Sequence, residues 1–104
     1  MTVVALLSVA PVTAGSMAAD VADAVAALDE FDVSYETNPM GTVIEADDVG
    51  TLFAACEAAH RAVDADRVST VVKIDDKRTS DESAASKVAG VEAALGREAR
   101  SDRD

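Results

Sequence analysis

The fold is decided by the stretch Y-E-T-N-P-M-G-T-V-I-E, residues 35–45. Tyr35 alternates with polar neighbours, and a β-branched run follows at 42–44, which is typical of strands. Between them, Pro39 fixes its own φ angle and lacks an N–H, while Gly41 can adopt a positive φ. The stretch therefore predicts a β-hairpin with strands over 31–37 and 42–46, although an Asn-Pro-x-Gly segment considered alone is most often only a turn.

Further elements are predicted on both sides of the hairpin. The nearly continuous Val, Leu and Ala run at 2–9 indicates a strand covered on both faces, and 67–74 indicates a fourth strand. Apolar residues at helical spacing predict a helix from Ser16, its N-cap, to about residue 28. The Asp47–Asp48 pair is a good N-cap for a second helix, which ends near residue 63. A third is predicted over about 83–99.

The element order β-α-β-β-α-β-α predicts an α+β, ferredoxin-like fold. This arrangement has a four-stranded antiparallel sheet, two helices on one face and, here, an extra C-terminal helix. We expect the first and fourth strands to be central, residues 1–99 to form one domain, and 100–104 to be a charged tail. Because the strand at 2–9 is apolar on both faces, the third helix or another subunit must cover the second face.

The composition indicates an oligomer with an acidic surface. Of the 104 residues, 49% are hydrophobic but only 3% are aromatic, so the core is thin and association would bury more surface. The net charge of −11 would repel nucleic acids and anionic membranes. Because the carboxylates are spread along the chain, we interpret this charge as a halophilic adaptation, in which salt screens the self-repulsion.

Few residues point to catalysis. Cys56, the single cysteine, excludes an internal disulfide and is predicted to lie in the core. Without a signal peptide or long apolar run, a cytoplasmic protein is expected. No nucleotide, zinc or nucleophile motif is present, so we predict no enzymatic activity, cofactor or metal.

Lys73, in the apolar fourth strand, could lie at a sheet edge or pair with an acid. We favour an ion pair with Glu45 over a ligand contact.

Four segments resemble the family of small thiamine-binding proteins. They are the first strand leading to Pro11 and Gly15-Ser16, the hairpin at 35–45, Ala58-Ala59-His60, and the stretch at 67–78. The resemblance spans about residues 3–95 and departs in the acidic surface and the short link at 64–66. It implies a ferredoxin-like fold, a homo-oligomer that is commonly a tetramer built as a dimer of dimers, and binding of thiamine or its hydroxymethylpyrimidine part without known catalysis.

We place the ligand against the hairpin turn and the adjoining end of the sheet. The candidate binding residues offer hydroxyl, amide, thioether, aromatic or ammonium groups: Ser16, Tyr35, Asn38, Met40, Thr42 and Lys73. A cleft with apolar walls and a few such groups suits a flat, polar heteroaromatic cation. The alternative is a regulatory small-molecule-sensing module of the amino-acid-binding type, although such modules are usually fused to an enzyme.

The charge generates a prediction about salt. Self-repulsion from a net charge of −11 should destabilise the fold at low ionic strength, because screening weakens as salt is removed. The thermal unfolding midpoint should rise from dilute to molar salt in a series monitored by circular dichroism. A midpoint that does not change across the series would contradict halophilic adaptation.

Overall fold

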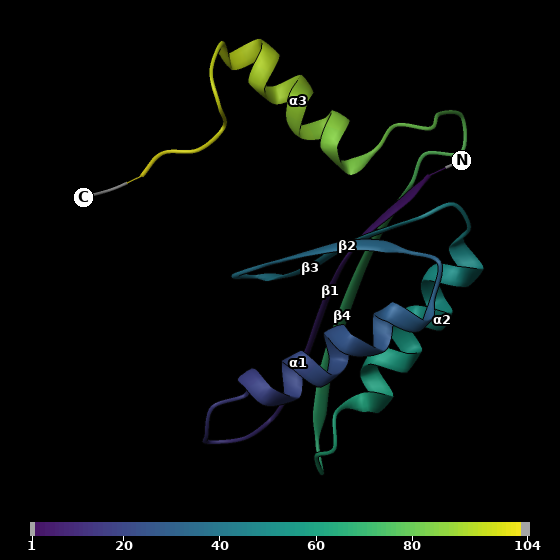
Figure 1. Ribbon diagram of the computed structural model, residues 1–104, viewed down its shortest axis with the longest axis vertical. Coiled ribbons are helices and arrows are strands. Elements are labelled where there is room, and N and C mark those ends of the chain that lie inside the picture. Colours follow the sequence, from purple (N-terminus) through teal and green to yellow (C-terminus); the bar gives the residue numbers. More distant parts are fainter. Residues whose placement is uncertain (1, 103–104) are drawn as a thin grey trace.

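The computed structural model describes residues 2–102 and has the predicted order of elements. A central strand, β1 (Val3–Pro11), leads to helix α1 (Ala18–Ala27) and a 3-10 turn at 28–30. The hairpin follows as β2 (Ser34–Asn38) and β3 (Gly41–Ala46). Then come α2 (Val49–Ala62), β4 (Val68–Asp76) and α3 (Ala84–Leu95). Both α1 and α2 cover the same side of the sheet (Figure 1). The ferredoxin-like α+β prediction is confirmed.

The sheet has the strand order β2-β3-β1-β4, with every neighbouring pair antiparallel. The prediction that the fourth strand is central is therefore wrong: β1 and β3 are central, and β4 is an edge strand. β1 pairs with β4 along its whole length, from Val3–Asp76 to Pro11–Val68. Its pairing with β3 stops at Leu7–Thr42. β1 thus extends beyond the hairpin.

The core lies between the sheet and the two helices, on the face that we call the inner face. Alternate residues of β1 point toward it, and Val3, Ala5, Leu7 and Val9 are all buried. They pack with buried residues of the helices and β3, among them Leu28, Ile44, Leu52, Ala55 and Ala59. Cys56 is 5% exposed, as predicted for a core residue, and burial raises the pKa of its thiol.

One of the two predicted helix caps is confirmed. Asp48 is the N-cap of α2, and its Oδ2 accepts a hydrogen bond of 3.1 Å from the N–H of Thr51. The N-cap of α1 is Met17 rather than Ser16. The helix begins one residue later because the C=O of Met17 accepts its first backbone bond, from Val21 at 2.9 Å.

Helix α3 does not cover the second, outer face of the sheet. Two contacts hold its first turns to the sheet: Glu45 Oε1 accepts a hydrogen bond of 2.9 Å from the N–H of Ala84, and Lys87 pairs with Asp75 at 2.5 Å. Beyond them the helix stands away from the strands and buries none of its residues (Figure 1). It also ends earlier than predicted, at Leu95, and is followed by the C-cap Gly96, whose φ of 81° lies in the left-handed region.

The predicted ion pair between Lys73 and Glu45 does not form within residues 2–102. The reason is the strand order, because β1 separates the two strands: Glu45 lies opposite Val4, and Lys73 lies opposite Leu6. Two strand spacings amount to about 9.6 Å. Glu45 instead accepts from the N–H of Ala84, and Lys73 is exposed on the edge strand β4, where its ammonium helps to lower the pKa of Asp75 after the larger effects of Lys87.

Candidate functional site

A cleft opens on the inner face where the hairpin turn, the end of β1 and helix α1 meet. Its volume is ≈ 170 Å³, similar to the roughly 150 Å³ of a protein cavity that holds one benzene ring. Its lining residues come from the tip of the β2–β3 hairpin, the end of β1 and α1, and Figure 1 shows the hairpin tip and the start of α1 on the same side of the molecule. Among residues 2–102, no charged side chain lines it, and its walls are mostly apolar, from Leu7, Val9, Met17, Val21, Ala24, Val25, Leu28, Pro39 and Met40.

The backbone of the hairpin turn is fixed by close packing and by a side chain. Gly41 has φ = 158°, and a Cβ at this position would lie 2.8 Å from the C=O of Leu7, so only glycine fits. Asn38 Oδ1 accepts a hydrogen bond of 2.9 Å from the N–H of Met40. The Asn38 carbonyl is therefore committed to the turn, and its NH₂ group is left as the donor that could reach a ligand.

Two threonines bring hydroxyl groups to the cleft. Thr37 and Thr42 are directly opposed on β2 and β3, and their Oγ1 atoms lie 2.9 Å apart. Thr42 is only 4% exposed. Two hydroxyls carry two protons and one is used between them, so the pair keeps one O–H to donate and lone pairs to accept. This pair can orient a polar ring without introducing charge.

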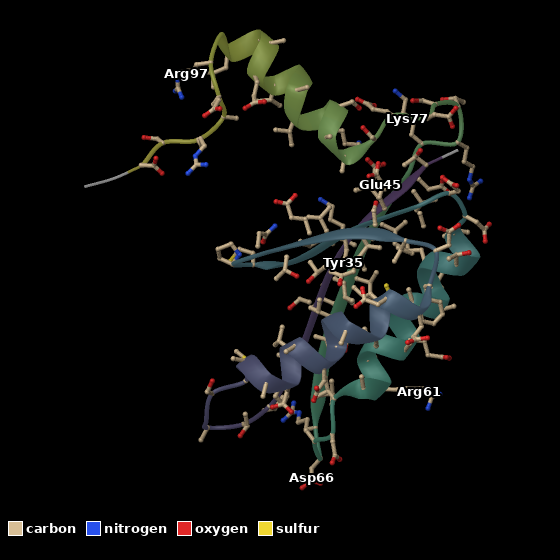
Figure 2. All side chains as sticks on the ribbon, viewed as in Figure 1. Tyr35, Glu45, Arg61, Asp66, Lys77 and Arg97 are labelled. Atoms are coloured by element: carbon tan, nitrogen blue, oxygen red, sulfur yellow. The ribbon has the colours of Figure 1, made fainter. Side chains whose placement is uncertain are left out.

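Tyr35 and Ser16 belong to an adjoining groove rather than to the cleft. Tyr35 lies on the side of the sheet that faces α1 (Figure 2), and its O–H donates to Asp29 Oδ1 at 2.7 Å. The groove runs along α1, is lined by Ser16, Tyr35 and Asp29, and shares Met17, Val21, Val25 and Thr37 with the cleft. The two hollows therefore adjoin each other. The hydrogen bond to Asp29, then burial, then the Asp29 charge raise the pKa of Tyr35.

The structure gathers three of the six predicted residues around the cleft: Asn38, Met40 and Thr42. Ser16 and Tyr35 lie in the adjoining groove. Lys73 lies away from both, on the outer face, opposite Leu6 of β1.

The sequence analysis did not single out the walls of the cleft from β1 and α1. The alternation in β1 and the helical spacing of Met17, Val21 and Val25 placed these side chains toward the core. The sequence did not indicate that β1 is longer than its neighbour β3. β1 has nine residues and β3 has six. That difference is what leaves room for a cleft beyond the hairpin.

These features define a small ferredoxin-like α+β protein with a ring-sized cleft at its hairpin turn. The sequence profile described as thiamine-binding protein matches residues 5–92. The chain belongs to this thiamine-binding protein family. Within residues 2–102, every helix is too short or too polar to cross a membrane.

Three relatives support the assignment. A UPF0045 protein of Methanothermobacter thermautotrophicus is 46% identical over 79 residues, which is 73% of this chain and 80% of the relative. The crystal structure of a hypothetical protein from Methanocaldococcus jannaschii has a TM-score of 0.80 at 33% identity, covering 86% of this chain and 95% of that one. A candidate thiamine biosynthesis/salvage protein from Thermotoga maritima shares the fold, with a TM-score of 0.75 at 19% identity over 88% of this chain and 99% of that one.

The contact between Tyr35 and Asp29 generates a prediction about titration. Substituting Asp29→Asn weakens the hydrogen bond that holds the phenol proton and removes the negative charge that opposes ionisation, so the pKa of Tyr35 should fall from its raised value toward the ordinary one. Ultraviolet absorbance reports this residue alone, because the chain has one tyrosine and no tryptophan. Asp23→Asn, in helix α1 just before the 3-10 turn that holds Asp29, is the control. Identical Tyr35 titrations in the wild type and in Asp29→Asn would show that the contact does not form in solution.

Proposed function

We propose that this protein binds thiamine or its hydroxymethylpyrimidine part in the cleft and does not chemically transform it. The observation that carries the proposal is the apolar, ring-sized cleft at the hairpin turn, in a chain of the thiamine-binding family. The pyrimidine ring lies between the apolar wall of α1 and the turn. The thioethers of Met17 and Met40 contact the ring, and the Thr37–Thr42 hydroxyls and the Asn38 NH₂ contact its polar atoms.

The positively charged thiazolium of thiamine then occupies the adjoining groove. The groove adjoins the cleft and carries Asp29 together with the ring of Tyr35, two groups that attract a cation. The net charge of −11 adds a general attraction for a cation, which salt screens. Lys73 takes no part in this arrangement, since it lies on the outer face.

The proposal includes assembly into a homo-oligomer, with a dimer of dimers as the expected form. Support comes from the outer patch, which we define as the apolar residues of the outer sheet face and α3: Val4, Leu6, Val43, Val71, Val88, Val91 and Leu95. Several of them are strongly exposed in the single chain, including Val71 at 61% and Val91 at 58%. Apolar surface gathered in this way is typical of an interface. The cytoplasmic location and the halophilic adaptation remain part of the proposal.

The first test measures affinity by calorimetric titration with hydroxymethylpyrimidine. Asn38→Asp keeps the oxygen that accepts from the Met40 N–H but loses the NH₂ group. It should weaken binding by about 1 kcal/mol, or roughly fivefold, with an almost unchanged unfolding midpoint. Met40→Ala should also weaken binding, because it removes a contact with the ring.

The matched control is Lys73→Met, which changes the opposite face of the sheet and should leave the affinity unchanged. If Asn38→Asp and Met40→Ala both bind as tightly as the wild type, the cleft is not the binding site. If thiamine and hydroxymethylpyrimidine both fail to bind the wild-type protein, the proposed function itself is wrong.

The second test addresses assembly by light scattering in molar salt. The wild type should be an oligomer at micromolar concentration, and Val91→Glu should reduce its mass, because it places a charge in the outer patch. Val12→Glu is the matched control, since Val12 is about equally exposed, at 53%, but lies outside the patch. A stable folded wild-type monomer under these conditions would contradict the assembly proposal.

A further inference from the structure

The end of β1 has one strand edge without a neighbour. β1 pairs with β4 through Pro11, whereas its pairing with β3 stops at Leu7–Thr42. If the ladder with β3 continued, Val9 would lie opposite Met40. The chain turns at that point instead, and the N–H of Met40 donates to Asn38 Oδ1. At Val9, β1 therefore has a neighbouring strand on one side only, which is β4. Val9 also lines the cleft.

The direction of the Val9 main-chain groups follows from its neighbours. In an antiparallel strand, a residue directs its N–H and C=O toward the same side, and successive residues alternate. Val12 donates its N–H to the C=O of Arg67 at 2.8 Å, so the even-numbered residues face β4. The C=O of Leu7 faces Gly41 of the hairpin. Val9, two residues further on, directs both groups past the turn and into the cleft.

These two groups have no protein partner. Within residues 2–102, neither the N–H nor the C=O of Val9 forms a hydrogen bond across this edge. The residue is only 6% exposed. Main-chain groups at buried positions are nearly always paired, because leaving them unpaired is costly. An unpaired donor and acceptor side by side in a cleft therefore indicate a ligand that carries the complementary pair.

The same edge is unsuited to another strand. The next residue that faces this way is Pro11, which has no N–H, and on the other side the edge is closed by the hairpin. An added strand would gain the two hydrogen bonds of Val9 and then meet a missing donor. The edge fits a small molecule with one donor and one acceptor better than a peptide or a second copy of the chain.

Building on the proposed function, we propose that the main-chain N–H and C=O of Val9 hold the amino-substituted edge of the pyrimidine. A 4-aminopyrimidine presents a ring nitrogen, which accepts from the Val9 N–H, beside an amino group, which donates to the Val9 C=O. The ring then continues the sheet in place of a residue of β3. A 4-oxopyrimidine in the same orientation presents the reverse pattern, an N–H beside a C=O. The Val9 N–H would then face another N–H, and the Val9 C=O would face another C=O. The site therefore selects aminopyrimidines over their oxo counterparts.

The first experiment compares two ligands on the wild-type protein by calorimetry. They are hydroxymethylpyrimidine with its 4-amino group and the analogue with a 4-oxo group in its place. The amino compound should bind about tenfold or more tightly, because the oxo compound loses two hydrogen bonds and gains two repulsive contacts. Equal affinities would overturn the role of Val9 and leave thiamine binding intact. Failure of both compounds and of thiamine would instead overturn the proposed function, and this inference with it.

The second experiment observes Val9 directly by amide hydrogen exchange in nitrogen-15 spectra. The Val9 amide should exchange faster than that of Leu7 in the free protein, and it should become protected when hydroxymethylpyrimidine is added. A Val9 amide that is unaffected by bound ligand would contradict the proposal. Protection that rises with protein concentration in the absence of ligand would show that a second copy pairs with this edge, and would also overturn it.

A pair of variants completes the test. Val9→Pro removes the N–H, while Val9→Ala keeps it and accounts for the loss of side-chain packing. Proline is compatible with this edge because Pro11 already occupies the equivalent orientation. Val9→Pro should bind the amino compound at least tenfold more weakly than Val9→Ala. Equal binding by the two variants would count against the proposal, and if Val9→Pro does not fold, the ligand pair and the exchange measurement still decide.

Discussion

The pairing of β1 with two neighbours of unequal length is the constraint on which the rest of the structure depends. β4 matches all nine residues of β1, whereas β3 matches only its first five. The inner face therefore holds a continuous core under α2, but beyond Leu7 the sheet is one strand narrower, and α1 lies over the gap. The cleft is formed by this missing strand segment, with the hairpin turn as its wall, and Gly41 is required there because the turn packs directly against β1.

The two faces of the sheet have different chemistry, and this places the proposed ligand site and the proposed subunit interface on opposite sides. On the inner face, the cleft combines apolar side chains with hydroxyl, amide and main-chain groups and has no charge in its lining. On the outer face, exposed valines and Leu6 lie beside an α3 that contributes further apolar residues. Lys87 with Asp75, and Glu45 with the N–H of Ala84, fix where α3 begins. A partner docked on the outer face would not block the cleft.

The sequence was informative wherever a local pattern determined the structure. The hairpin, the Asp48 cap, the burial of Cys56 and the element order all follow from turn chemistry, capping and periodicity. The errors arose where distant strands determine the outcome. The position of β4 at the edge could not be read from its apolar sequence, and the Lys73–Glu45 pairing failed for the same reason. For the candidate site, the sequence pointed to turn residues that the structure places around the cleft, but it did not point to Val9, because the proposed role of Val9 lies in its main chain and in the length of a neighbouring strand.

The proposed main-chain recognition explains how so small a chain could bind a polar ring with few polar side chains. A side chain that reaches into a cleft loses rotamer freedom when it binds, whereas a residue of β1 is already ordered by nine pairs with β4. The N–H and C=O of Val9 are therefore held in place before the ligand arrives. In the free protein, leaving these groups unpaired at a nearly buried position destabilises the fold. A ligand that pairs with them removes this destabilisation. The open edge thus makes the cleft selective for a ligand that supplies the missing pair.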